Sequence, residues 1–135
     1  MITIAQYFGP WIHHKDVTEG YMENASRLLD AVDKLMAYAI EDMVDLPIND
    51  ETGSQVSGEQ YGGFRPFDCP IGARTSAHKV ALAVDVYDPK NTLDEWITDE
   101  VLEECGLYRE HPNSTPHWCH LSIRRPGSGK RTFFP

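Results

Sequence analysis

One long stretch with helical periodicity constrains the fold more than any other feature of the sequence. From residue 16 to residue 45, apolar side chains recur every three or four positions, which is the spacing of a helix that buries one face. The stripe consists of Met22, Ala25, Leu29, Val32, Met36, Ala39 and Met43, widened by Leu28 and Leu35. Asp16 followed by Glu19 is typical of a capping box, and Pro47 cannot continue a helix. The sequence therefore predicts one long helix with its apolar face in the core.

Two short stretches further along the chain have the pattern of strands. Residues 82–87, "LAVDVY", and 117–123, "HWCHLSI", combine β-branched, aromatic and apolar residues over a strand's length. Between them, "NTLDEWITDEVLEECGL" predicts a second helix, with Thr92 as its N-cap and Gly106 as its C-cap. The order of these elements predicts an α+β fold in which the long helix packs on a small antiparallel sheet.

The remaining segments connect and flank these elements. Residues 47–75 are rich in Gly, Pro, Asn, Asp and Ser, and a loop of this length predicts an ordered segment that shapes a site. Residues 1–15 carry aromatic side chains and are expected to pack onto the domain, whereas residues 124–135 form a basic tail. A chain of 135 residues with 41% hydrophobic residues predicts one domain with a real core.

Charge and cysteine content narrow the classes of function. The net charge of −9 argues against binding nucleic acid through bulk electrostatics. No stretch is apolar enough to predict membrane insertion, and the first residues do not have the pattern of a secretory signal. Cys69, Cys105 and Cys119 fit no zinc pattern, so we expect free thiols, with a Cys69–Cys119 bridge left open.

Two polar residues interrupt the apolar strands. Asp85 lies on the face of its strand opposite the Val and Leu side chains, and His120 occupies one face of the other strand. If the strands pair, both side chains can point into one cleft, and His78 could fold over the same place. Two histidines and a carboxylate are typical ligands of a catalytic zinc ion. Each could instead be an ordinary core residue or accept hydrogen bonds from a loop.

Three blocks of the sequence resemble a known enzyme family. "SAHKVALAVD", from Ser76 to Asp85, resembles the pattern S-x-H-x-x-G-x-A-x-D of the D-Ala-D-Ala carboxypeptidase/Hedgehog-type zinc peptidase superfamily. "WCH", from Trp118 to His120, is similar to its W-x-H block, and "GGFRP", from Gly62 to Pro66, is similar to its S-G-[FY]-R block. The resemblance covers about residues 18–123 and is greatest to small phage-encoded peptidoglycan peptidases.

The resemblance implies a ligand set, a substrate and a reaction. The zinc ligands that it implies are His78, Asp85 and His120. Arg65 matches the arginine that binds the substrate and polarises its carbonyl group, and Ser76 would line the site. Trp118 could be a platform for the substrate or a wall of the cleft. The implied reaction is zinc-dependent hydrolysis of a peptide bond in the peptidoglycan stem.

Two positions depart from the family pattern. Ala81 occupies the position of the motif glycine. His117 occupies the position three residues before the last histidine ligand, where active members commonly have a glutamate. The general base is therefore left open between His117, Glu110, which we expect in the preceding loop, and the absence of any base.

The resemblance also implies where such a protein acts. It would act at the bacterial cell wall or within a phage particle, as an endolysin or a virion-associated murein hydrolase, and the lack of a secretory signal pattern predicts that it is made in the cytoplasm. The alternative is a catalytically inactive protein of the same fold that serves as a virion structural component, in contact with other virion proteins, or as a wall-binding module.

Overall fold

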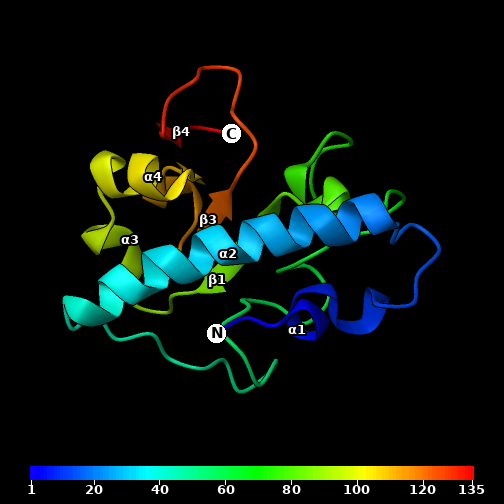
Figure 1. Ribbon diagram of the computed structural model, residues 1–135, viewed down its shortest axis with the longest axis horizontal. Coiled ribbons are helices and arrows are strands. Elements are labelled where there is room, and N and C mark those ends of the chain that lie inside the picture. The colour runs from blue at the N-terminus through cyan, green and yellow to red at the C-terminus, as the bar shows by residue number, and fades with distance from the viewer.

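The computed structural model describes residues 1–135 and has the expected α+β architecture, with a long helix packed on a four-stranded sheet (Figure 1). The α-helices are α1 (Ile4–Phe8), α2 (Glu19–Glu41), α3 (Thr92–Trp96) and α4 (Asp99–Cys105). The strands are β1 (Ala83–Tyr87), β2 (Tyr108–Glu110), β3 (Trp118–Ser122) and β4 (Thr132–Phe133). Three short 3-10 helices are η1 (Gly9–Trp11), η2 (Ala77–Val80) and η3 (Pro112–Ser114). None of the helices combines the length and apolar character that crossing a bilayer requires.

The long helix α2 is confirmed, but both of its predicted ends are wrong. Its N-cap is Thr18, whose side chain accepts from the third amide of the helix, whereas Asp16 accepts from the amide of Phe67 at 2.9 Å. The helix ends well before Pro47, because the backbone turns left-handed at Met43 (φ 64°). The amide of Val44 then donates back to an α2 carbonyl at 2.9 Å, which closes the last turn. Met43 is 91% exposed and is not part of the core face.

The sheet is mixed, in contrast to the antiparallel sheet that the sequence predicted. Its strand order is β1-β3-β2-β4, and β3 pairs antiparallel with both β1 and β2. The tail forms β4, which runs parallel to β2. Strands of two and three residues are too short to show an alternating pattern, so β2 and β4 have no signal in the sequence.

The predicted second helix is two separate helices. Ile97 is extended (ψ 132°), and Thr98 starts α4 as a new N-cap. Thr92 does not cap α3; instead the buried carboxylate of Asp88 accepts from two amides of its first turn, at 3.0 and 2.9 Å. Gly106, in the left-handed conformation (φ 72°), is confirmed as the C-cap.

The core lies between α2 and one face of the sheet. The buried face of α2 consists of Ala25, Leu28, Leu29, Val32, Leu35, Met36 and Ala39. It belongs to the same apolar cluster as Val84 and Val86 of β1 and Leu121 of β3. Tyr7 and Phe8 join this cluster, so the N-terminal residues pack onto the domain as expected. The opposite face of the sheet is left for the polar side chains of the strands.

The 47–75 loop is folded against the outer edge of β1. Val56 forms a bridge with Val86, and both backbone groups of Asp85 are hydrogen bonded to loop residues, at 2.7 and 2.8 Å. Phe64 is buried and its ring lies 5.3 Å from that of Phe8. This loop therefore fixes β1 from the side that has no neighbouring strand, and it carries Arg65 toward Asp85.

Candidate metal centre

Three elements bring His78, Asp85 and His120 together. Asp85 on β1 is directly opposite His120 on β3, and η2 places His78 beside them. The Asp85 Oδ1 atom lies 2.9 Å from His120 Nδ1 and 3.3 Å from His78 Nε2. All three side chains are buried, and they form one of two groups in the chain whose ligand atoms are close enough to share a metal ion. The predicted convergence of these residues is confirmed.

The hydrogen bond of His78 decides which of its nitrogens faces Asp85 as an acceptor. His78 Nδ1 lies 2.8 Å from the carbonyl oxygen of Gly63, which can only accept, so Nδ1 carries the proton. Burial lowers the pKa of His78, which favours the neutral ring. The lone pair of Nε2 therefore faces Asp85 Oδ1, and two acceptors at 3.3 Å repel each other unless a proton or a metal ion lies between them. A metal ion fits this arrangement.

Gly63 allows the backbone contact that holds this geometry. A Cβ atom at this position would overlap the carbonyl oxygen of Tyr7 in α1. That oxygen accepts from the amide of Phe64 at 3.2 Å, and the hydroxyl of Tyr7 donates to the carbonyl of Ala83 in β1 at 2.8 Å. The N-terminal helix thus positions the carbonyl group that orients His78.

The two oxygens of Asp85 have different partners. Oδ1 faces the two histidines, whereas Oδ2 accepts from Arg65 Nη2 at 3.3 Å. Arg65 is 9% exposed, and its Nε donates to the carbonyl of Tyr61 at 2.7 Å. Burial raises the pKa of Asp85, but the hydrogen bond from His120 Nδ1 at 2.9 Å and the positive charge of that ring when it is protonated act in the opposite direction, so that the net pKa is lowered. The carboxylate is therefore ionised at neutral pH and is available as a ligand.

His120 responds to Asp85 in the opposite sense from His78. Burial lowers the pKa of His120, but the hydrogen bond to Asp85 and its negative charge outweigh this effect and raise the pKa above its ordinary value. The ring of Phe133 is an apolar neighbour of His120. The two rings are nearly perpendicular, and their centroids lie 6.3 Å apart. A metal ion bound at Nδ1 of His120 would therefore have to displace a proton.

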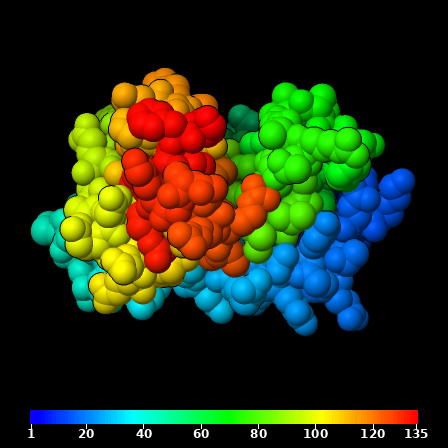
Figure 2. Space-filling view, turned by 90° about the horizontal axis from the view of Figure 1, so that it is seen from above, coloured from blue at the N-terminus to red at the C-terminus, as the bar shows by residue number.

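A cavity of about 500 Å³ opens over the three ligands. One wall is the segment that contains Arg65 and Ser76, and the other is formed by Trp118 and the C-terminal residues, including Phe133. Figure 2 shows the C-terminal residues in orange and red facing the green segment across a notch. Arg65, Ser76 and Trp118 thus lie where a ligand would touch them, and their roles in binding remain predictions.

Glu110 lies in the same cavity, although the sequence placed it in a loop. It is the last residue of β2, where Arg109 is paired with Leu121 of β3. Continuing this register by one residue places Glu110 opposite His120, and Glu110 is itself paired with Phe133 of β4. One row of side chains therefore crosses the sheet, from Asp85 through His120 and Glu110 to Phe133.

His117 is not brought to the site. Its backbone is left-handed (φ 79°), the side chain is exposed, and Nδ1 lies 3.1 Å from the carbonyl oxygen of Pro89. It is not among the residues that line the cavity. The physical reason is local: a positive φ immediately before β3 turns the side chain away from the face that His120 occupies.

Ala81 adopts the left-handed backbone conformation that favours glycine. It is the C-cap of η2, fully buried, with φ 59° and ψ 36°. An L-residue in this region is strained by about 1 kcal/mol. The turn between His78 and β1 is thus formed although Ala81 replaces the glycine of the family pattern.

The three cysteines are free and buried, and they take no part in the site.

The sequence alone did not indicate two parts of the site, the C-terminal wall with Arg124 and Phe133 and the role of Gly63 in orienting His78. Only the quoted "GGFRP" block pointed to the neighbourhood of Gly63. No family model, curated protein or solved structure matches the chain, so the chemistry is argued from this geometry.

Proposed function

We propose that the protein is a zinc-dependent peptidase that cleaves peptidoglycan stem peptides, as a phage lytic or virion-associated murein hydrolase. One observation carries this proposal: His78 Nε2 and His120 Nδ1 converge on Asp85 Oδ1 beneath a cavity that also contains Glu110 and Arg65. The resemblance of the three sequence blocks to zinc peptidases supports the choice of substrate.

The donor set favours zinc among the metals. Two imidazole nitrogens and one carboxylate oxygen are the ligands of many catalytic zinc sites, and the cavity leaves room for a further ligand. Zinc in such a site supplies Lewis-acid chemistry, which polarises a carbonyl group and lowers the pKa of a water molecule toward about 7.

The other residues of the cavity provide proton transfer and charge. Glu110 is the only side-chain carboxylate lining the cavity apart from Asp85, and we assign it as the general base that takes a proton from the attacking water. Arg65 is held by Asp85 and by the Tyr61 carbonyl, which fixes its guanidinium at the cavity wall. From there it can donate to a substrate carbonyl oxygen or to a terminal carboxylate.

Metal analysis of the purified protein tests the site. We expect about one zinc ion per chain in the wild type and its loss in His78→Ala, because a catalytic zinc site depends on each of its three protein ligands. His117→Ala is the matched control, since it removes a histidine that lies outside the cavity. A wild-type protein that binds no zinc would contradict the proposal.

Digestion of purified peptidoglycan tests the activity. Mass spectrometry of the released stem peptides should show cleavage by the wild type and about a hundredfold slower cleavage by Glu110→Gln, the loss typical of a general base. His117→Ala should cleave at the wild-type rate. The opposite result, with His117→Ala inactive and Glu110→Gln active, would assign the base to His117.

One observation favours a second candidate function. The residue three positions before His120 is a histidine whose side chain faces Pro89, so the usual position of the base holds no group at the site. A protein that binds zinc but cleaves no peptidoglycan would be an inactive member of the fold, acting as a virion structural component or a wall-binding module. The same digest separates the two functions.

A further inference from the structure

The C-terminal wall of the cavity carries an arginine that the fold does not otherwise use. Arg124 lies in the bend that directly follows β3, and it lines the cavity together with His120 and Ser122 of that strand. Its amide donates to Ser122 Oγ at 3.0 Å, which fixes the backbone at this point. The position of Arg124 relative to the metal centre is therefore set by the strand that carries His120.

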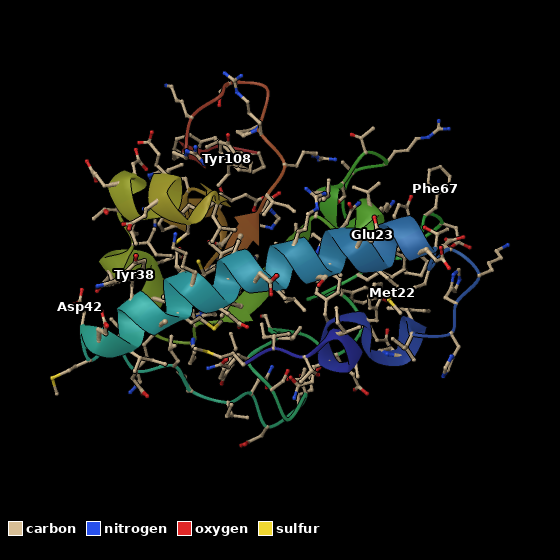
Figure 3. The ribbon with its side chains drawn as sticks, viewed as in Figure 1. Met22, Glu23, Tyr38, Asp42, Phe67 and Tyr108 are labelled. Atoms are coloured by element: carbon tan, nitrogen blue, oxygen red, sulfur yellow. The ribbon has the colours of Figure 1, made fainter.

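The guanidinium of Arg124 has no partner within the protein, although the chain has 21 acidic and 12 basic residues. The arginine ion pairs of the structure are Arg65 with Asp85 and Arg109 with Asp94. Arg131 is also occupied, because it donates to a carbonyl at 3.0 Å and lies over the ring of Tyr108, labelled in Figure 3. Arg124 is exposed at the cavity and keeps its hydrogen-bond donors free.

Two arginines thus line opposite walls of the cavity. Arg65 belongs to the 47–75 loop, and Arg124 belongs to the C-terminal wall. The planar guanidinium group of an arginine matches the geometry of a carboxylate, so an arginine with free donors at a cavity can bind a negatively charged ligand. A cavity of about 500 Å³ is of the size that holds a small ligand such as a few residues of a peptide.

We infer that Arg124 is a specificity-determining residue that binds an internal carboxylate of the substrate. The preferred substrate is then an anionic peptide that carries a free carboxylate in addition to the one at its C-terminus. This inference rests on the proposed function, because it takes the stem peptide as the ligand of this cavity.

Calorimetric titration with two synthetic stem tetrapeptides tests this inference. In one peptide the internal carboxylate is free, and in the other it is amidated while the C-terminal carboxylate is kept. The zinc-loaded protein carries Glu110→Gln in every case, so that the ligand stays intact. We expect the acidic peptide to bind about fivefold more tightly than its amide, which is the effect of one partly exposed ion pair.

The contribution of Arg124 is isolated by a matched pair of variants. Arg124→Gln should abolish the preference for the acidic peptide and leave the affinity for the amide unchanged. Arg125→Gln removes the same charge from the next residue, which is exposed outside the cavity, and should keep the preference. The fivefold difference should also shrink at high salt.

The outcomes separate this inference from the proposed function. Equal affinity for the two peptides, equal effects of Arg124→Gln and Arg125→Gln, or no binding of the acidic peptide would overturn the inference. Peptidoglycan cleavage without any preference for the acid would keep the proposed function and reject the role of Arg124. Preferential binding of the acidic peptide without cleavage by the wild type would keep the role of Arg124 in binding and reject the proposed peptidase activity.

Discussion

At the scale of single residues, the site depends on how one buried carboxylate is neutralised. Asp85 lies within an apolar strand, where an unpaired charge would be strongly destabilising. Its Oδ1 faces two histidine nitrogens and its Oδ2 accepts from Arg65, so each oxygen has a compensating neighbour. A neutral His78 presents a lone pair to this carboxylate, and a cation bound between the two would relieve their repulsion, which is the physical reason for proposing a metal.

Gly63 is the residue on which the orientation of His78 depends. We expect Gly63→Ala to lower the free energy of unfolding by about 2 to 3 kcal/mol, because its Cβ would overlap the Tyr7 carbonyl and force the backbone to move. Zinc affinity should fall by about tenfold as the partner of His78 Nδ1 shifts. Urea unfolding of the zinc-free protein and a zinc titration measure the two effects.

Gly127 provides the control for this substitution. A Cβ there meets nothing within 4 Å, so Gly127→Ala should change stability by less than about 0.5 kcal/mol and leave zinc affinity unchanged. If Gly63→Ala is as well tolerated as Gly127→Ala, the contact between α1 and the loop does not orient His78.

At the scale of elements, several helix ends are set by residues that local patterns do not identify. Asp88 caps α3 from outside the helix, and the left-handed Met43 ends α2 ahead of Pro47. Figure 3 shows Asp42, the residue before Met43, at the end of α2, beyond Tyr38. In both cases the helix terminus is set by hydrogen bonds that satisfy the amides or carbonyls of the terminal turn. The nearest proline or predicted cap residue does not set it.

The cap of α3 gives a test of this view. Asp88→Ala should lower the free energy of unfolding by about 2 kcal/mol, because two buried amides would lose their acceptor. Thr92→Ala, at the N-cap that the sequence predicted, should change it by no more than about 0.5 kcal/mol, because Thr92 is exposed, makes only one long side-chain hydrogen bond (3.4 Å) and is replaced by a good helix former. Thermal or urea unfolding of the two variants compares them directly, and a larger effect of Thr92→Ala would favour the sequence-based cap.

At the scale of the whole molecule, the fold couples the metal centre to pH through the ligands. The pKa of Asp85 is lowered in the folded state, so its stabilising effect is present above its unfolded value near 4 and is lost as the pH falls further. The pKa of His120 is raised, so its protonated form stabilises the metal-free fold below about pH 6.5, and that effect is lost as the pH rises through the folded pKa.

Zinc binding should therefore weaken as the pH is lowered through neutrality. Because the pKa of His120 is above its ordinary value, protons compete with zinc already above about pH 6.5. A competition titration with a chelator between about pH 8 and pH 5.5 should show affinity falling by about tenfold per pH unit at the acid end. His117→Ala should give the same profile, and a constant affinity over this range would exclude His120 as a ligand.

The sequence by itself determined the elements with strong local periodicity and the residues they carry. The long apolar stripe specified α2, and the apolar runs around Asp85 and His120 specified β1 and β3. Alternation along those two strands was enough to place both side chains on one face, away from the core. The fold class and the placement of Asp85 and His120 followed from these local rules, whereas His78 lies before the first strand and entered the ligand set through the sequence resemblance.

Only the tertiary structure decided what surrounds those ligands. Glu110 and Phe133 reach the site on strands of three and two residues, which exist because distant segments pair in the sheet and which carry no periodic signal of their own. The exclusion of His117 depends on one positive φ angle, and the orientation of His78 depends on a backbone contact between α1 and the loop. Such features arise from contacts between segments far apart in sequence, so no local pattern of residues encodes them.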